Sequence, residues 1–148
     1  MKMKRKLSFL TLALLLLSLV LSLSACSVYG TIEKNFTAAG YKVVDTTTSE
    51  GENALAFLLD TEENGKLSCT VHLLKKELGT YAVILEFGAD KDAQAKLSEM
   101  LTDADIDNFK QVDDTAKLLR GNCILIPVTL NIFSAEAIVT EMVTLFNK

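Results

Sequence analysis

The stretch Leu67–Phe87, LSCTVHLLKKELGTYAVILEF, contains two segments in which apolar and polar side chains alternate. The first runs over residues 67–73 and the second over residues 81–87, and Leu78-Gly79-Thr80 stands between them. Alternation with a period of two is typical of a β-strand that buries one face. The stretch therefore predicts an antiparallel hairpin, from which the order of the remaining elements can be worked out in both directions.

Downstream of the hairpin the pattern predicts helix, strand and helix. Asp90 can cap a helix with an apolar stripe, and residues 109–119 are expected to include one or two short strands. Gly121-Asn122 is a turn signal, and Cys123–Leu130 is apolar at almost every position, as expected of a central strand covered on both faces. Ser134 can cap a last helix with a continuous apolar stripe to Phe146.

Upstream of the hairpin, the residues Val28, Ile32, Phe36 and Ala39 fall on one helical face, and Gly40 stands where helices often end. A strand is expected over residues 41–45. Residues 54–59 are compatible with a strand or with a helix, and they precede the hairpin-type turn signal Glu63-Asn64-Gly65.

This order of elements predicts an α+β domain, an antiparallel sheet of about five or six strands with helices packed on one face. A ferredoxin-like βαββα core from Tyr81 onward is one arrangement that would satisfy it.

The N-terminus has the organisation of an export signal. Met1–Lys6 holds four cations, residues 7–23 are nearly all apolar or small, and no acidic residue occurs before Glu33. The sequence Leu23-Ser24-Ala25-Cys26 that follows resembles the lipobox of bacterial lipoproteins. That resemblance implies recognition of Leu23, Ser24 and Ala25 by a signal peptidase, loss of residues 1–25, and attachment of diacylglycerol to Cys26. The chain would then be held on the extracytoplasmic face of the cell membrane.

An uncleaved signal anchor is the alternative, because residues 7–23 form an apolar stretch of 17 residues, at the short end of what spans a bilayer. Cys26 would then be an ordinary thiol at the membrane interface, with the domain on the same side of the same membrane.

Residues 26–148 form the expected single domain. Loss of residues 1–25 removes four of the 15 cations and none of the 19 acids, which changes the net charge from −4 to −8. An acidic domain is repelled by nucleic acid and by anionic head groups, so neither is an expected ligand. The partners expected instead are the membrane, through the lipid on Cys26, and a protein of the cell envelope.

Few residues offer catalytic chemistry. His72 is the single histidine and lies on the polar side of its strand, which predicts a solvated side chain. Cys69 and Cys123 fall in apolar alternation and are expected as free core thiols, although a disulfide between them remains open outside the cytoplasm. No Cys-x-x-Cys motif is present to support redox catalysis.

One acidic cluster has the spacing of a metal site. Asp103, Asp105 and Asp107 alternate as at the start of an EF-hand loop, but position 12 is Asp114 where a glutamate is expected. A solvated acidic turn is the simpler interpretation, and no metal or other cofactor is expected.

The mature part resembles small uncharacterised lipoproteins of Gram-positive bacteria. The resemblance lies in Phe36 with residues 39–45 and in residues 120–126, and it brings no activity with it. We therefore expect a non-catalytic protein-binding or accessory module at the cell envelope, not an enzyme. The alternative is a small-ligand-binding lipoprotein that uses the open face of the sheet.

The lipid anchor is directly testable. Mass spectrometry of the protein from bacterial membranes should identify Cys26 as the N-terminal residue, carrying diacylglycerol, because the signal peptidase cleaves after Ala25. A peptide that begins at Met1 in the mature protein would contradict the prediction.

Overall fold

The computed structural model describes residues 27–49, 51–53, 69–77, 79–102 and 112–148. Five strands form one sheet in the order β1-β2-β3-β5-β4, and every neighbouring pair is antiparallel. The strands are β1 (Lys42–Val44), β2 (Cys69–Lys75), β3 (Thr80–Phe87), β4 (Leu119–Arg120) and β5 (Cys123–Thr129). The helices are α2 (Val28–Ala38), α4 (Asp90–Thr102), the short 3-10 helix η2 (Thr115–Leu118) and α5 (Ala135–Asn147). The predicted α+β class and antiparallel sheet are confirmed.

The predicted hairpin is formed by β2 and β3. Val71 lies opposite Leu85, and the pairing continues from Cys69 with Phe87 to Lys75 with Tyr81. Because opposite residues of an antiparallel pair share a face, this register assigns every side chain of the two strands to one of two surfaces.

The centre of the sheet is the pairing of β3 with β5. Ile84 lies opposite Leu125 on one face, Leu85 lies opposite Ile124 on the other, and all four side chains are buried. The expectation that residues 123–130 form a strand covered on both faces is therefore confirmed for β5.

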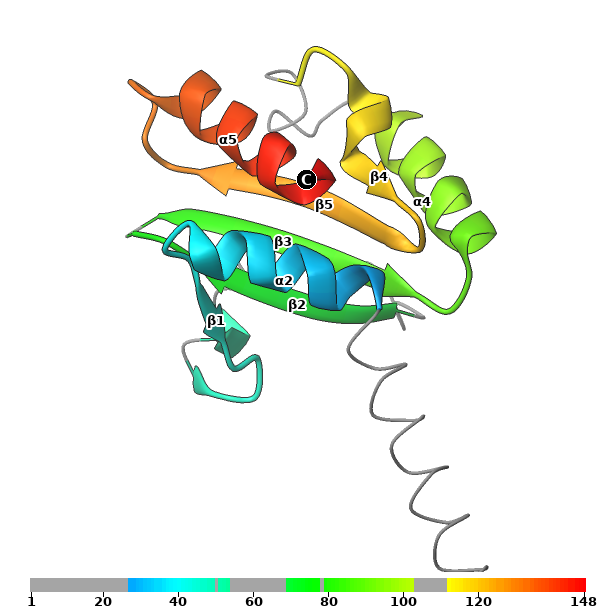
Figure 1. The fold of residues 1–148 in the computed structure, drawn as a ribbon, viewed down its shortest axis with the longest axis horizontal. Coiled ribbons are helices and arrows are strands. Elements are labelled where there is room, and N and C mark those ends of the chain that lie inside the picture. Colours follow the sequence, from blue (N-terminus) through cyan, green and yellow to red (C-terminus); the bar gives the residue numbers. More distant parts are fainter. Residues whose placement is uncertain (1–26, 50, 54–68, 78, 103–111) are drawn as a thin grey trace, which may run out of the picture.

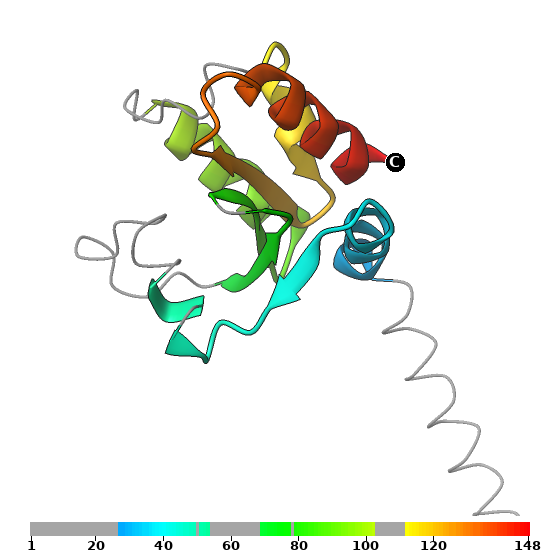
Figure 2. The ribbon, with the colours of Figure 1, turned by 90° about the vertical axis from the view of Figure 1, so that its left-hand side faces the viewer.

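Helices lie on both sides of this centre. α2 and α5 pack together on the face that carries Ile84 and Leu125 (Figure 1). α4 contacts β3, β5 and β4 from the opposite face, and Figure 2 shows the sheet between α4 and the α2–α5 pair. Two long helices thus share one face, as expected, and the third covers part of the other.

The strand order agrees with the ferredoxin-like hypothesis, but the layering does not. From Thr80 onward the chain runs β3-α4-β4-β5-α5, and β5 lies between β3 and β4, which are parallel to each other. In a ferredoxin-like core both helices cover one face of the sheet, whereas α4 and α5 cover opposite faces here. The reason is that β3 and β5 are apolar on both faces and need cover on both.

α2 matches its predicted pattern closely. Ser27 is the N-cap, and its Oγ accepts a hydrogen bond of 3.0 Å from the Gly30 amide. Ile32 and Phe36 are fully buried against the sheet and α5. Gly40, with φ 93°, follows the helix in the left-handed conformation that glycine adopts without strain.

One segment differs from its prediction. One or two short strands were expected within residues 109–119, but of this range the described part holds η2 at residues 115–118 and only the first residue of β4, Leu119, while residues 109–111 lie outside the described residues. The cause is local, since the Asp114 carboxylate accepts a hydrogen bond of 3.1 Å from the Ala116 amide and starts a helical turn. Residues 54–59 and the turn signal at 63–65 lie outside the described residues.

Tyr41, between α2 and β1, is a buried residue with an unusual hydroxyl group. Its ring packs edge-on against Phe36 with 4.9 Å between ring centroids, and Lys76 Nζ lies 5.3 Å from the ring centroid. Its Oη is buried and has no hydrogen-bond partner in the described part of the chain. Burial, with Glu141 and Glu77 nearby, raises the pKa of Tyr41.

Tyr41→Phe should therefore leave the free energy of unfolding unchanged or raise it by about 1 kcal/mol. The substitution keeps the ring contacts and removes a buried hydroxyl without a partner, a group whose burial costs about 1–3 kcal/mol. Urea unfolding measures the difference, and Phe36→Ala, expected to cost about 3–5 kcal/mol, serves as the destabilised reference. A loss above about 1 kcal/mol in Tyr41→Phe would mean that the hydroxyl is hydrogen-bonded after all.

Candidate functional site

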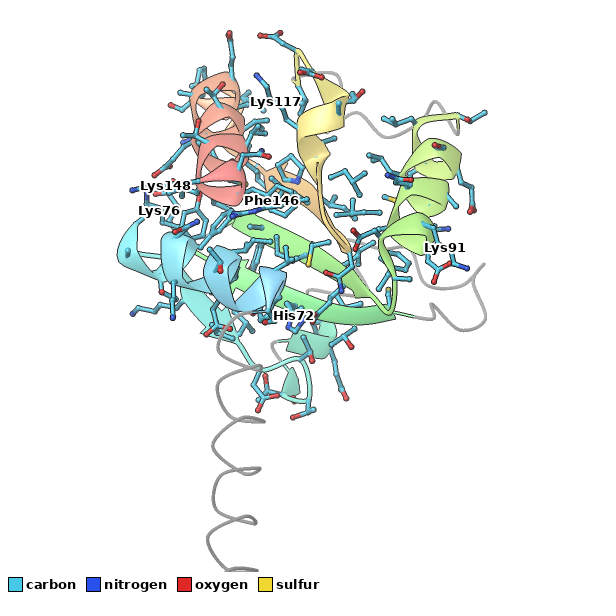
Figure 3. All side chains as sticks on the ribbon, turned by 45° about the vertical axis from the view of Figure 1, so that its right-hand side comes forward. His72, Lys76, Lys91, Lys117, Phe146 and Lys148 are labelled. Atoms are coloured by element: carbon cyan, nitrogen blue, oxygen red, sulfur yellow. The ribbon has the colours of Figure 1, made fainter. Side chains whose placement is uncertain are left out.

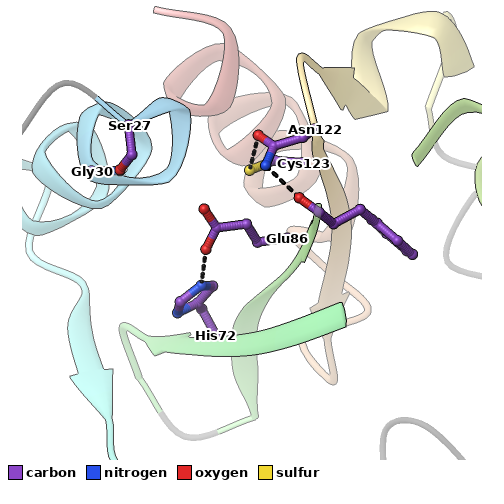
Figure 4. A network of polar contacts seen from close by, with 7 residues as sticks. Ser27, Gly30, His72, Glu86, Asn122 and Cys123 are labelled. Atoms are coloured by element: carbon purple, nitrogen blue, oxygen red, sulfur yellow. Dashed lines mark hydrogen bonds and ion pairs between the residues drawn. The ribbon is translucent and has the colours of Figure 1, made fainter. Parts of the chain in front are cut away.

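A small aromatic and polar cluster, made by Tyr29, His72 and Glu86, holds the first turn of α2 on the sheet. The Tyr29 ring stacks on the His72 ring, with 3.4 Å between centroids and 11° between planes. His72 Nε2 lies 2.8 Å from Glu86 Oε2, across the β2–β3 pair (Figure 4). Burial and the neighbouring Glu33 and Glu86 carboxylates raise the pKa of the Tyr29 hydroxyl.

This cluster corrects the interpretation of His72 as a solvated strand residue. Its side chain is only 20% exposed and that of Glu86 27%, because α2 covers the face of the β2–β3 pair on which both lie. One ring nitrogen bonds to Glu86 and one ring face is covered by Tyr29. The sole histidine thus holds α2 on the sheet.

The two thiols are separated by the sheet itself. Cys69 pairs with Phe87 and Cys123 pairs with Glu86, so their side chains point to opposite faces, and β3 lies between their strands. Two strand spacings amount to about 10 Å, beyond the Cα separation that a disulfide tolerates. Both cysteines are free, and the open alternative of a disulfide is wrong.

Burial also makes both thiols poor nucleophiles. It raises the pKa of Cys123 to about 12, and Glu86 adds to the effect. Burial raises the pKa of Cys69 as well, although Lys96 nearby opposes the shift. Neither site has the electropositive, exposed surroundings of a reactive cysteine.

Several predicted site residues lie outside the described residues. These are the lipidation site Cys26, the signal-peptidase residues Leu23, Ser24 and Ala25, and the weak metal candidates Asp103, Asp105 and Asp107. Within the described ranges, no group of three or more His, Cys, Asp or Glu side chains is placed to hold a metal ion.

The most exposed apolar surface is the loop between β5 and α5, which we call the apolar loop, Leu130–Phe133. Phe133 is 95% exposed, Ile132 79% and Leu130 63%. The sequence prediction missed this surface, because Leu130 was placed in a buried strand and the residues after it were given no role. The signal available was the pair Ile132-Phe133, directly before the expected helix cap Ser134 and separated from Leu130 by the polar Asn131.

Hydrogen bonds at both ends give the apolar loop a defined conformation. The Leu130 amide donates to the Gly79 carbonyl over 2.8 Å, and the Asn131 amide donates to Thr129 Oγ1 over 3.1 Å. The Asn131 side chain in turn accepts from the Ser134 amide at 3.2 Å. The loop is thus held with Ile132 and Phe133 pointing into solvent.

The apolar loop and the start of α2 lie at opposite ends of β5. The loop follows Thr129, whereas the turn before Cys123 touches the first residue of α2. A Cβ on Gly121, which has φ 56°, would lie 3.0 Å from Val28 Cγ2, so glycine allows this close approach without a shift of the valine side chain. A seven-residue strand spans about 20 Å, and this distance separates the two ends.

The state of the thiols can be measured by alkylation. Burial raises the pKa of Cys123 to about 12, far above pH 8, so iodoacetamide should leave this thiol unmodified in the native protein. The half-exposed Cys69 should react faster than Cys123, and both should react fully in denaturant without reductant. Peptide mass spectrometry assigns each site, and protection that ends only on reduction would contradict the absence of a disulfide.

Comparison with protein-family models, with curated proteins and with solved structures gives no significant match to this chain. None of the helices in the described ranges combines the length and the apolar character needed to cross a bilayer.

Proposed function

We propose that this chain is an extracytoplasmic lipoprotein, anchored through Cys26, that acts as a non-catalytic binding module for a protein of the cell envelope. The apolar loop is the contact surface. The observation that carries the proposal is the exposure of Ile132 and Phe133 on a loop whose backbone is fixed by hydrogen bonds.

Exposed side chains of this size favour a role in binding. Burying an isoleucine or phenylalanine contributes about 1.5–3 kcal/mol, and this gain is not realised while both remain in water. Because the backbone of the apolar loop is already fixed, its adjacent apolar side chains lose little conformational freedom when a partner binds. Residues that contribute most of the binding energy of an interface share this property. A partner with a matching apolar pocket would recover the energy.

The position of the loop relative to the anchor supports a protein partner. Ser27 caps α2, so a lipid on Cys26 would be attached one residue before the helix cap and would hold the domain close to the bilayer. The apolar loop lies at the far end of β5 from the start of α2. A mature domain with net charge −8 is also repelled by anionic lipid surfaces. Both facts favour a protein over the membrane as the occupant.

The residues with catalytic potential have structural contacts instead. His72 is stacked on Tyr29 and bonded to Glu86, and burial keeps the Cys123 thiol protonated near neutral pH by raising its pKa. These contacts support a binding role.

The alternative function, a small ligand on the open face of the sheet, has less support. α4 packs against β3, β5 and β4 on the face away from α2 and α5, and Val83 and Leu85 on that face are buried.

Site-specific photo-crosslinking tests the proposed function. A photoreactive phenylalanine at position 133 should give one stoichiometric protein adduct in intact cells. Ile132→Ser with Phe133→Ser should weaken the captured complex by about tenfold or more, the usual effect of removing an interface anchor. Affinity measured with the captured partner reports the change.

The matched control is Val43, an apolar residue on the edge strand β1 that is 52% exposed. Val43→Ser should leave the affinity unchanged, and a photoreactive residue at position 43 should not capture the same partner. Adducts with lipid only, or equal capture from positions 43 and 133, would refute the apolar loop as the contact surface.

A further inference from the structure

We propose that the groove between η2 and α5 binds a small amphipathic anion, a molecule with an apolar chain and one carboxylate or phosphate group. This groove is distinct from the apolar loop, so the inference does not depend on the proposed function.

The groove has the size and the lining of a ligand site. Its volume is about 460 Å³, within the range of about 300–1,000 Å³ typical of small-molecule sites. Its apolar surface comes from Val112, before η2, and from Val139 and Val143 of α5. Thr140 and Thr144, one turn apart on α5, add hydroxyl groups beside the valines. An apolar chain of a few carbons can lie along this surface.

A specific contact holds the two walls together. Asn147 Nδ2 donates one hydrogen bond to the Lys117 carbonyl and one to the Val143 carbonyl, each 2.8 Å long. The first bond joins the last turn of α5 to η2, and the second fixes the amide on its own helix. The width of the groove is therefore set by the fold.

Four charged residues line the groove, the lysines Lys117 and Lys148 and the aspartates Asp113 and Asp114. Lys117 and Lys148 both line it, and in the part of the chain that the structure describes neither has a carboxylate within 4.0 Å. Lys76 and Lys96 elsewhere are paired with Glu141 and Glu99. Figure 3 shows Lys117 at the η2 side of α5 and Lys91 far from it on α4.

Two acidic residues also line the groove but are differently placed. The Asp114 carboxylate accepts the Ala116 amide and is committed to the start of η2. Asp113 is exposed beside it. Asp113, Asp114 and Lys117 lie on the η2 wall and Lys148 follows α5 on the other wall, so the anionic group of a bound ligand would be held by the two lysines while its apolar chain lies on the valines.

The acidity of the whole domain does not oppose this local recognition. At physiological salt the Debye length is about 8 Å, so charges beyond the groove are largely screened. The two lysines act at contact distance, where screening is weakest.

Photolabelling of the full chain in phosphatidylcholine nanodiscs tests the site. The probe is decanoic acid that carries a diazirine on its chain. Labelling should saturate with probe concentration, and mass spectrometry should map the adducts to residues 112–117 or 139–148. Decanoate should compete with the probe at least about fivefold better than decanol does. Lys117→Gln with Lys148→Gln should reduce affinity by about threefold to tenfold, since each exposed ion pair contributes little.

The matched control is Lys34→Gln with Lys91→Gln, two exposed lysines on α2 and α4, which should label like the wild type.

A second arm places a diazirine phospholipid in the bilayer. Adducts at the groove from this lipid would support a membrane source of the anion, and adducts from the free acid alone would support a soluble source. Equal displacement by decanol, unchanged labelling of the Lys117→Gln and Lys148→Gln variant, or scattered adducts would overturn the proposal.

Discussion

The pairing of β3 with β5 is the constraint on which the rest of the structure depends. Each strand carries apolar side chains on both faces, so neither face can be left to water. Ile84 and Leu125 need cover on one side and Leu85 and Ile124 on the other. Because one layer of helices can cover one face only, the fold places α2 and α5 on one side and α4 on the other. The division of the helices follows from the composition of two strands.

Strong periodic patterns made much of this fold predictable. The alternation of β2 and β3, the unbroken apolar run of β5 and the stripes of α2 and α5 each depend on local spacing, which the sequence states directly. The predictions that proved wrong concern residues whose burial is determined by an element far away in the sequence. His72 alternates with apolar residues and was expected in water, but α2, more than 30 residues earlier, covers it. No local pattern could reveal that Tyr29 would stack on its ring.

The candidate sites were the least predictable part, for a related reason. Exposure of Phe133 depends on where β5 ends and α5 begins, and the apolar pattern from Cys123 to Phe133, interrupted only by a few polar residues, does not fix where the strand leaves the core. The groove depends on η2, which forms because Asp114 bonds to the Ala116 amide instead of continuing an extended chain. Both surfaces result from a competition between local hydrogen bonds and strand pairing, in which a difference of about 1 kcal/mol is enough to decide the outcome.

The same central strand also relates the proposed anchor to the proposed contact surface. β5 is paired with β3 along its whole length, with β4 at Cys123 and Ile124, and is buried on both faces, which makes it a rigid part of the domain. The start of α2 touches the turn at one end of β5, and the apolar loop leaves from the other. A domain held at Cys26 would therefore present Phe133 at a fixed distance from the membrane. A partner protein that binds Phe133 at this distance requires no conformational change within the domain. The cluster of Tyr29, His72 and Glu86, which holds α2 in place, agrees with such a rigid domain.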